Sequence, residues 1–446
     1  MNRRKNTEKL TTRMLIAIIL AVVCGLGTIV LREHLLSTGK EATWTIINNI
    51  LFADISAATN DKAIGLFYII GRLFVKALQL IIIPMVFTSI ILAIIRITDS
   101  KKLGRIASKT IGYFLGTTVV SILLATAVGI LAYNAGAFRN AAVDLAGTQG
   151  TGATNPLMIV VNAVPDNLIS ALGNNTGILA VVVCALSVGL AVNSAGDRIR
   201  LLPGICEEIS LVISKVLTFV VEKFGPVAIF CLITRACAAY GVSYLKPAVA
   251  YMLLTVALLL LMLTVGYACF VKMTTGLNPL PFCRKTARVA LFGFSTSSSA
   301  ATLPLNMKTT TEHLGVHEEI ASFVLPLGMT VNMDGTAIMQ VIATIFIAGC
   351  SGVELSLPKL LLIGVLAIIA SIGTPASPGA GAVILFTILS GAGINNEYAL
   401  IAYSLVIAIN RPIEMLVTAL NVVGDSACAV AVAKSEEAID LEKYRE

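Results

Sequence analysis

The amino-acid sequence predicts an all-α membrane protein, and two observations carry that prediction. Hydrophobic residues make up 57% of the 446 residues and charged residues only 13%, with a mean hydropathy of +0.90, far from the values of soluble domains. In addition, segment after segment contains the roughly 20 apolar residues that a helix needs to cross a bilayer. A soluble protein with a large apolar core would not contain such long uncharged runs. The chain is therefore expected to cross a lipid bilayer several times.

The basic residues are dispersed in short clusters, so the net charge of +7 does not indicate a nucleic-acid partner. The loops 134–160 and 236–244 contain almost no Lys or Arg. Because cytoplasmic loops carry an excess of Lys and Arg, this alternation predicts a multi-pass protein of the inner (plasma) membrane with both termini in the cytoplasm. The charged end from Lys434 to Glu446 is expected to be solvated. The basic clusters lie at 3–5 with 13, 96–109, 198–200 and 272–288.

The first apolar run, Met14–Leu31, is expected to be a retained helix. It follows basic residues as a signal peptide would, but it is too long and no small-residue cleavage site follows it. The nine cysteines are scattered without a CxxC pair, which favours free buried thiols. A segment containing Pro84 is too long to cross upright, so a tilt or kink is expected there. The helices expected before the last third are 14–31, 63–97, 105–133, a broken region over 157–194, 207–235 and 245–272, with a flexible loop over 134–156.

The last third contains two segments that are expected to be re-entrant hairpins. Residues 284–308 and 358–391 each place a polar tip between two apolar limbs that are too short to span a membrane alone. The first tip is rich in Ser and Thr, and the second reads "SIGTPASPGAGA" over 371–382. A polar tip that faced lipid would leave backbone groups unsatisfied, so both tips should be buried in protein. Hairpin tips also bring helix N-termini together, which suits a substrate carboxylate.

Each hairpin precedes a long apolar segment that polar residues interrupt, and this pairing forms a weak internal repeat. Paired interrupted segments indicate a transporter binding site near the bilayer midplane. Two kinked structural helices are the alternative, but they would not require several acidic groups in the same regions. The segment 319–350 carries Asn332, Asp334 and Thr336, and the segment 397–433 carries Arg411, Glu414, Thr418, Asn421 and Asp425.

Asp334 and Asp425 have no obvious basic partner at the same depth, and burial of an uncompensated carboxylate is costly. A hard monovalent cation held by carboxylate and carbonyl oxygens would compensate both charges. The alternative is that the two side chains are protonated or paired with Lys76 or Arg235, in which case a proton would be the coupling ion. Glycines are expected to unwind the helices there and free carbonyl groups for the ion. These glycines are Gly328, Gly335 and Gly424.

An enzyme is not expected, because the sequence contains no nucleophile elbow, no HExxH motif and no Walker A motif. An ion channel is the rival class of membrane protein. It would explain buried polar residues, but it would not explain two hairpins that are each followed by acidic segments. The pattern of residues therefore favours a transporter.

Four motifs, taken in order, resemble those of one known family. The chain from the first helix to about residue 436 is similar to the glutamate-transporter family of dicarboxylate/amino acid:cation symporters, in its prokaryotic form. This resemblance implies eight transmembrane helices plus two re-entrant hairpins, assembled as a homotrimer in the lipid bilayer. It also implies an elevator mechanism, in which the second hairpin is the extracellular gate. The motifs are "STSSSAATLP" at 295–304, "NMDGT" at 332–336, "GTPASPGAGA" at 373–382 and "TALNVVGD" at 418–425.

The resemblance assigns parts of the chain to a scaffold and a transport domain, and it assigns ion and substrate residues. The implied parts are 1–104 (scaffold), 105–156 (a transport-domain helix and the extracellular loop after it), 157–244 (scaffold and trimer contacts) and 245–446 (transport-domain core). The implied sodium ligands are Asp425 with Gly328, Asn332 and Asn421; Thr330, Ser371, Ile372 and Thr374; and Thr117, Thr118, Asn332 and Asp334. The implied substrate residues are Ser299, Thr336, Ser377, Gly381, Glu414, Val417, Thr418 and Asn421.

Two of these substrate positions depart from the family pattern. Glu414 stands where the family has an aspartate that binds the substrate amino group, and Val417 stands where transporters of acidic amino acids have an arginine. We therefore expect a sodium-coupled symporter that imports neutral amino acids, either small ones or cystine. Arg411, one helical turn before Glu414, leaves an alternative. It could pair with Glu414. Alternatively, it could bind the carboxylate of an acidic amino acid or dicarboxylate in a symporter, with a proton as the alternative coupling ion.

Overall fold

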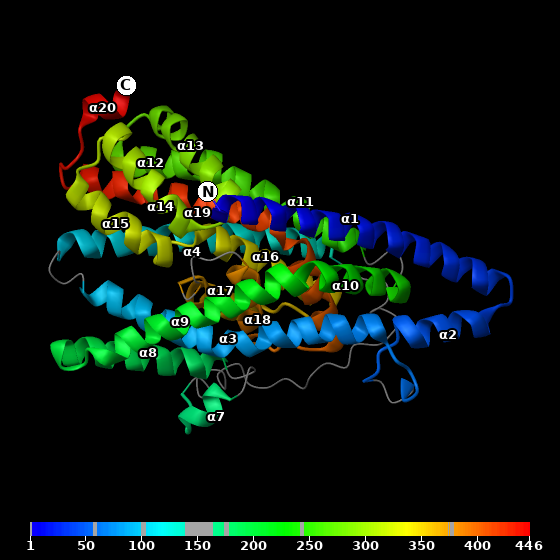
Figure 1. Cartoon of the computed structure of the whole chain (residues 1–446). Coiled ribbons are helices and arrows are strands. Elements are labelled where there is room, and N and C mark those ends of the chain that lie inside the picture. Colours follow the sequence, from blue (N-terminus) through cyan, green and yellow to red (C-terminus); the bar gives the residue numbers. More distant parts are fainter. Residues whose placement is uncertain are drawn as a thin grey trace.

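The computed structural model describes residues 2–56, 60–99, 104–138, 164–173, 178–240, 245–372, 374 and 379–446. Within these ranges the chain is helical, without a β-strand and with a single isolated bridge between Val316 and Ile439. Most of the long helices run along one common direction (Figure 1). The described residues include seven stretches that are long and apolar enough to cross a membrane. These are Ile19–Ser37, Leu66–Leu92, Arg105–Asn134, Leu201–Ala238, Lys246–Thr275, Glu318–Cys350 and Ile409–Ser435.

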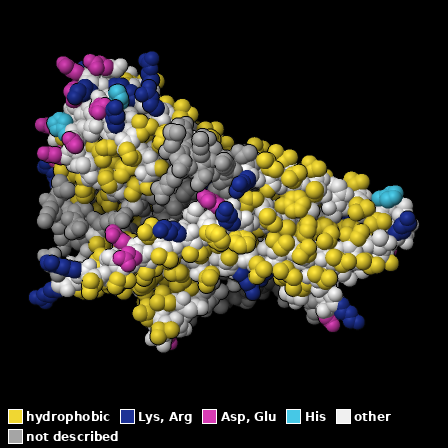
Figure 2. Space-filling model, viewed as in Figure 1, with side chains coloured by type: hydrophobic (Ala, Val, Ile, Leu, Met, Phe, Trp, Pro, Cys, Tyr) yellow, Lys and Arg dark blue, Asp and Glu magenta, His cyan; other side chains and the backbone are white. Residues whose placement is uncertain are grey.

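The surface agrees with an integral membrane protein. Hydrophobic side chains cover most of the length of the face in Figure 2, and charged side chains gather at the end that carries the C-terminus. Many large hydrophobic side chains are exposed, among them Leu80 (76%) and Leu131 (70%). Contact of so much apolar surface with water would be unfavourable. In a bilayer the same exposure is favourable, because lipid chains are as apolar as leucine.

The first half of the chain differs in detail from the predicted helices. The first helix begins at Asn2 rather than at 14, and a helix over Glu41–Leu51 was not predicted. The predicted break over 157–194 is described only in part, and most of the predicted loop 134–156 lies outside the described residues. The helices are α1 (Asn2–Ser37), α2 (Glu41–Leu51), α3 (Leu66–Asp99), α4 (Arg105–Asn134), α7 (Leu168–Leu172), α8 (Ile178–Ala195), the 3-10 turn η3 (Gly196–Arg198), α9 (Leu201–Phe219), the π turn η4 (Val220–Phe224) and α10 (Gly225–Tyr240).

The second half begins with a helix that a π turn divides, and it then forms the two helical hairpins that the sequence predicts. The first hairpin turns at Ser297, whose φ of 50° ends one limb, and the Ser298 side chain accepts a hydrogen bond from the Ala301 N–H at 3.3 Å to begin the other. The elements are α11 (Leu245–Leu261), η6 (Met262–Gly266, a π turn), α12 (Tyr267–Thr275), α13 (Pro279–Thr296), α14 (Ser299–Lys308), η7 (Thr309–His313, a π turn), α17 (Leu357–Ile372) and α18 (Ala380–Gly391).

Only one of the two helices that were expected to be broken is broken. The segment 319–350 divides into α15 (Glu318–Val331) and α16 (Asp334–Cys350), with Asn332 and Met333 outside both helices. By contrast, α19 (Glu397–Ser435) continues through Pro412 and Gly424. The predicted break in 397–433 is wrong, because its polar side chains reach the centre of the protein from an intact helix. The weak internal repeat therefore consists of the hairpins alone.

The helices α16 and α19 form the centre of the protein. Nearly every residue of both is buried from Asp334 to Ala348 and from Asn410 to Ala433. The helix α16 contacts α4, α11, α17, α18 and α19, so neighbouring helices surround it (Figure 1). A polar side chain on α16 or α19 therefore meets other protein groups rather than lipid or water.

The C-terminal segment is exposed or half-exposed over most of its residues, as predicted, but one aromatic residue docks it against the protein. Tyr444 in α20 (Leu441–Arg445) is 1% exposed, and its hydroxyl donates to the Asn278 carbonyl at 3.0 Å. Lys285 Nζ donates to the carbonyls of Tyr444 at 3.1 Å and His313 at 2.9 Å. The many charged residues of this segment predicted exposure to solvent and gave no sign that the Tyr444 ring is buried.

An ion-pair cluster fixes the end of α19 to the start of α4. Glu436 contacts Arg105 and also accepts a hydrogen bond from Lys109 Nζ at 2.5 Å. Hydrogen bonds from Arg105 and Lys109 hold the pKa of Glu436 below its ordinary value. Because folding lowers this pKa, the cluster stabilises the folded state at pH values above the ordinary pKa of glutamate. This stabilisation is lost as the pH falls through the lowered pKa of Glu436.

We predict that Tyr444→Ala releases the C-terminal segment. Loss of a buried aromatic ring costs about 3–5 kcal/mol, so the open state should become more than about tenfold more populated. Carboxypeptidase should then shorten the chain correspondingly faster, as mass spectrometry of the intact protein would show. Tyr444→Phe keeps the ring and should lose only about 1 kcal/mol. Lys443→Ala changes a side chain that is 55% exposed and serves as the neighbouring control. Equal trimming of all three variants would contradict the docking.

Candidate functional site

Asp334 lies at the first position of α16, directly after the break in the helix, and its side chain is fully buried. Thr118 Oγ1 on α4 donates to Asp334 Oδ1 at 2.6 Å, and the Tyr267 hydroxyl on α12 donates to Oδ2 at 2.9 Å. A carboxylate at a helix N-terminus is also favoured by the helix dipole. Three elements that are distant in sequence thus meet at one acidic group.

Asn332 connects this group to the second buried carboxylate. Its side-chain Nδ2 donates to Asp425 Oδ1 at 3.0 Å, and its Oδ1 accepts from Thr117 Oγ1 at 3.4 Å. Asp425 is 2% exposed and lies on the continuous helix α19. The break between α15 and α16 therefore places an amide side chain between α4 and α19. The sequence-predicted residues Thr117, Thr118, Asn332, Asp334 and Asp425 lie in one buried polar cluster.

The two carboxylates have only neutral hydrogen-bond donors. No Lys, Arg or His among the described residues pairs with Asp334 or Asp425. Lys76 is exposed, and Arg235 donates to the Phe52 carbonyl at 2.9 Å and pairs with Asp54 at 3.5 Å. The alternative pairing with Lys76 or Arg235 is therefore wrong. Two buried charges without a counter-charge require a bound cation or protons. The described residues contain no group of three or more His, Cys, Asp and Glu side chains that could hold a metal ion.

Three glycines around this cluster lie inside helices, so the expectation that they unwind the backbone is wrong. A Cβ atom at Gly424 would lie 2.2 Å from the Tyr267 hydroxyl oxygen. One at Gly328 would lie 2.5 Å from Asp425 Oδ1, and one at Gly335 would lie 2.9 Å from the Val417 carbonyl oxygen. Such contacts are far too short for real atoms. The glycines are therefore needed for the close approach of polar groups to helix backbones.

A cavity of about 30 Å³ lies beside the acidic cluster, which is room for one or two water molecules. Seven of the eight predicted substrate residues line it, together with Thr374, which was predicted as a sodium ligand. Ser377, the eighth, lies outside the described residues. The predicted residues that line the cavity are Ser299, Thr336, Gly381, Glu414, Val417, Thr418 and Asn421.

Asn421 connects this cavity to the start of α16. Its Oδ1 accepts from the Gly335 N–H at 2.8 Å, and its Nδ2 donates to Thr336 Oγ1 at 3.3 Å. The Thr418 hydroxyl donates instead to the Glu414 carbonyl at 3.1 Å, within its own helix. The amide of Asn421, together with Asp425, therefore connects α19 to the helix break.

Glu414 is held by two donors, one of which is Arg411. Glu414 Oε2 accepts from Arg411 Nη1 at 3.2 Å, and Oε1 accepts from the Gly379 N–H, one residue before α18, at 2.6 Å. Arg411 does not line the 30 Å³ cavity but lines a neighbouring one of about 40 Å³. Its Nε and Nη2 atoms are buried and have no hydrogen-bond partner among the described residues. Of the two roles open to Arg411, this geometry has it paired with Glu414.

The remaining predicted sodium ligands lie at helix ends. Thr330 is in the last turn of α15, and Ser371 and Ile372 end α17, a helix that contacts α15. Carbonyl groups in the last turn of a helix have no partner within the helix, and they carry its negative dipole end. Gly328 and Ser371 are exceptions, because their carbonyls already accept from the Asn332 N–H at 2.8 Å and from the Thr374 N–H at 3.1 Å.

Sequence reasoning missed four residues of this region: Tyr267, Ser297, Met333 and Met339. Tyr267 is fully buried and follows the π turn η6 directly. A hydroxyl within an apolar run is its only signal in the sequence. The other three line the 30 Å³ cavity. Ser297 belongs to the serine-rich tip that was singled out, whereas the two methionines look like ordinary core residues.

A helical membrane protein that buries two uncompensated carboxylates beside a small cavity with polar lining residues has the features of a cation-coupled transporter. The chain belongs to the sodium:dicarboxylate symporter family, whose family model matches residues 10–435. It is 30% identical to the proton/glutamate-aspartate symporter of Escherichia coli over 84% of this chain and 86% of that protein. It is 27% identical to the proton/sodium-glutamate symport protein of Bacillus caldotenax, over 90% and 96% of the two chains. It is 29% identical to a C4-dicarboxylate transport protein of Deinococcus deserti over 84% of each.

We predict that Gly424→Ala destabilises the protein by about 1–3 kcal/mol, because the added methyl group must displace the Tyr267 hydroxyl from Asp334. The apparent melting temperature of the purified protein measures this effect. Gly112→Ala on α4 is the matched control, since nothing lies within 4 Å of the added Cβ atom. The control should be neutral or gain up to about 1 kcal/mol from helix propensity. Equal melting temperatures for the two variants would show that the close approach at Gly424 is unimportant.

Proposed function

We propose that this chain is a sodium-coupled symporter that imports an amino acid across the inner membrane. The observation that carries the proposal is the buried pair Asp334 and Asp425, which have only neutral donors. Sodium ions bind oxygen ligands, and carboxylate, hydroxyl and amide oxygens are gathered here. Membership of a family of sodium:dicarboxylate symporters supports the same conclusion.

The coupling ion follows from how the charges are neutralised. Each carboxylate oxygen of Asp334 accepts one hydrogen bond and has a second lone pair for a cation. The assigned ligands are those named above, with Asp425 and Asp334 in separate sites. A proton is the second candidate ion, because two of the relatives are named as proton-dependent symporters. Uptake driven by a sodium gradient at constant pH distinguishes the two ions.

The substrate we favour is a neutral amino acid, either a small one or cystine. Its ammonium group would bind Glu414, and its carboxylate would bind Ser299 and Asn421. Val417 offers no hydrogen-bond donor, and Arg411 faces the neighbouring cavity. The second carboxylate of an acidic substrate would therefore lie near Glu414 without a partner, which is costly.

An acidic amino acid or a C4-dicarboxylate is the second candidate substrate. The names of the similar proteins favour it, since each transports glutamate, aspartate or a C4-dicarboxylate. The two unpartnered nitrogens of Arg411 also favour it, because a small rotation of the guanidinium group would bring donors toward the substrate. Inhibition of uptake by aspartate, glutamate, serine, alanine and cystine decides between the two classes.

The assembly that accompanies this function is a homotrimer with an elevator movement. The scaffold would comprise 1–104 and 157–244, and the transport domain would comprise 105–156 and 245–446. The resemblance of the four motifs supports this division. The distribution of Lys and Arg supports a cytoplasmic location for both termini.

We predict that Asp425→Asn weakens sodium binding by at least about tenfold, because the neutral amide no longer offsets the cost of dehydrating the ion. Sodium-dependent thermal stabilisation of the purified protein measures binding, and proteoliposome uptake measures coupling. Substrate affinity should fall with it, since linked sites share one coupling free energy. Asp61→Asn, an exposed acidic position on another segment, should behave like the native protein. Normal sodium-dependent uptake by Asp425→Asn would refute the sodium role of this residue.

We predict that Val417→Arg shifts the preference of the transporter toward aspartate or glutamate, because the new guanidinium supplies a fork of donors for a second carboxylate. The potency of aspartate as an uptake inhibitor, relative to that of alanine, should rise by about tenfold or more. This corresponds to the free energy of one hydrogen bond between charged groups. Val417→Leu keeps an apolar side chain and should leave the ratio nearly unchanged. If aspartate or glutamate alone already inhibits the native protein strongly, the neutral substrate is wrong and Arg411 is the residue to test.

A further inference from the structure

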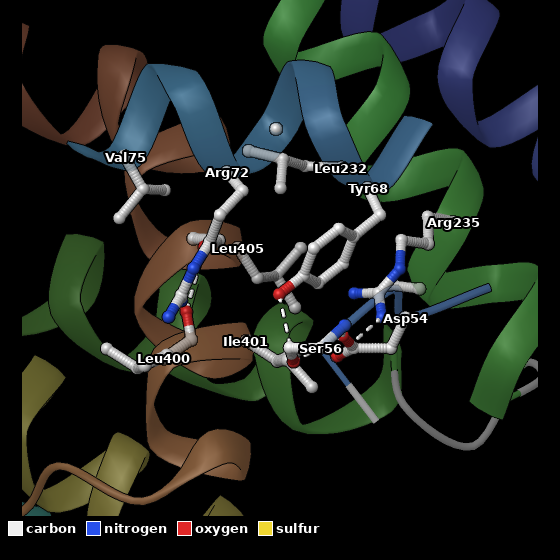
Figure 3. A pocket seen from close by; sticks show the side chains of 13 residues that line it. Asp54, Ser56, Tyr68, Arg72, Val75, Leu232, Arg235, Leu400, Ile401 and Leu405 are labelled. Atoms are coloured by element: carbon white, nitrogen blue, oxygen red, sulfur yellow. Dashed lines mark hydrogen bonds and ion pairs between the residues drawn. The ribbon is translucent and has the colours of Figure 1, made fainter. Parts of the chain in front are cut away.

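A third cavity, of about 220 Å³, lies between α3, α10 and the beginning of α19 (Figure 3). It is several times larger than the 30 Å³ cavity and shares none of the residues that line it. Tyr68 and Arg72 extend into it from one face of α3, and Arg235 extends from α10. Leu400 and Leu405 of α19 form an apolar wall.

One of the two arginines is already neutralised. Arg235 donates from Nε to the Phe52 carbonyl at 2.9 Å, and its Nη2 pairs with Asp54 at 3.5 Å. Its guanidinium carbon also lies 4.8 Å from the centre of the Tyr68 ring, a favourable cation–π distance. Arg235 therefore has a carboxylate partner for its charge and forms one side of the cavity.

Arg72 is the other arginine, and among the described residues it has no hydrogen bond or ion pair. The nearby hydroxyl groups have partners of their own: Tyr68 donates to Ser56 Oγ at 3.2 Å, and Ser404 donates to the Leu400 carbonyl at 2.8 Å. Two guanidinium groups against the single carboxylate of Asp54 leave one positive charge in the cavity. A charged side chain within an apolar membrane segment normally has a partner.

The backbone brings the two arginines into the same cavity through a close helix approach. A Cβ atom at Gly71 would lie 2.4 Å from the Leu232 side chain, so α3 and α10 pack together at the residue beside Arg72. On the opposite side, α10 contacts α19. The cavity therefore lies among three helices that pack against one another.

We propose that this cavity binds a singly charged oxyanion through Arg72, such as the phosphate group of an anionic lipid or a free phosphate ion. A guanidinium group presents a planar fork of donors that matches two oxyanion oxygens, and it is the group that proteins use for phosphate. Arg72 lies six residues into α3, roughly 9 Å along the helix at 1.5 Å per residue, which is within reach of lipid headgroups at a membrane surface. The leucine wall would contact the apolar part of a lipid.

The position of the bound anion has a mechanical consequence, which rests on the proposed elevator movement. The helices α3 and α10 belong to the proposed scaffold, whereas α19 belongs to the proposed transport domain. An anion that Arg72 holds against α19 would bridge the two and favour the present arrangement of the helices. The binding itself does not depend on that movement.

The first test measures thermal unfolding of the purified full-length protein in potassium phosphate and in potassium chloride at equal ionic strength and pH. Phosphate at about ten times its dissociation constant should raise the apparent melting temperature of the native protein by about 2 °C or more. Arg72→Gln should lose this rise. Arg288→Gln, which removes an exposed arginine on α13, should keep it. Arg72→Lys keeps the charge without the fork and should retain a smaller rise, which serves if Arg72→Gln does not fold.

The second test determines whether the anion is a lipid. The protein is purified with phosphatidylglycerol or with phosphatidylcholine, and bound lipid is counted by native mass spectrometry. A lipid ligand predicts phosphatidylglycerol on the native protein and on Arg288→Gln, with at least about tenfold less on Arg72→Gln. If Arg72→Gln loses the rise in melting temperature in phosphate but binds phosphatidylglycerol like the native protein, the ligand is a free oxyanion. No effect of Arg72 in either arm overturns the proposal. Neither test measures transport. A negative result would therefore overturn the anion site without contradicting the proposed transport function.

Discussion

The rest of the structure depends on two carboxylates, Asp334 and Asp425, that are buried without a basic partner. Dehydration of a charge is expensive, and every nearby feature reduces that expense. The break between α15 and α16 places Asp334 at a helix N-terminus and Asn332 between the two acids. Glycines then let hydroxyl, amide and carboxylate groups come against helix backbones at distances that a methyl group would forbid. Cation coupling explains why two carboxylates are buried without a positive partner, because the transported cation supplies the positive charge.

The sequence was sufficient for features that depend on local polarity, and insufficient for features that depend on distant partners. Apolar limbs around a polar tip predicted both hairpins, and one acidic residue in an apolar run located the break at Asn332. The continuity of α19 was not predictable, because polar residues mark a buried site whether or not the backbone opens. Tyr267 and the docked Tyr444 were missed for a related reason, since only their partners 67 and 166 residues away give them a role.

Glu414 joins the candidate substrate cavity to the second hairpin. One of its oxygens accepts from the Gly379 N–H next to α18, and the other accepts from Arg411. An ammonium group that enters the cavity must compete for these oxygens. A cavity with room for one or two water molecules is also smaller than an amino acid, so binding of one would require the cavity to widen. The hydrogen bond at Gly379 is the contact through which ligand binding and movement of the hairpin would be linked.

The π turn η6 sets the direction in which the Tyr267 side chain points. A single π turn holds one residue more than the α-helix around it, and such turns are frequent at functional sites. One residue corresponds to about 100° of rotation in a helix, so everything after Met262–Gly266 faces a different direction from the one that α11 alone would give. The hydroxyl group meets Asp334 only with that extra residue in place. Removal of one residue from this turn would therefore turn Tyr267 away from Asp334 by about that angle, although neither residue had been changed.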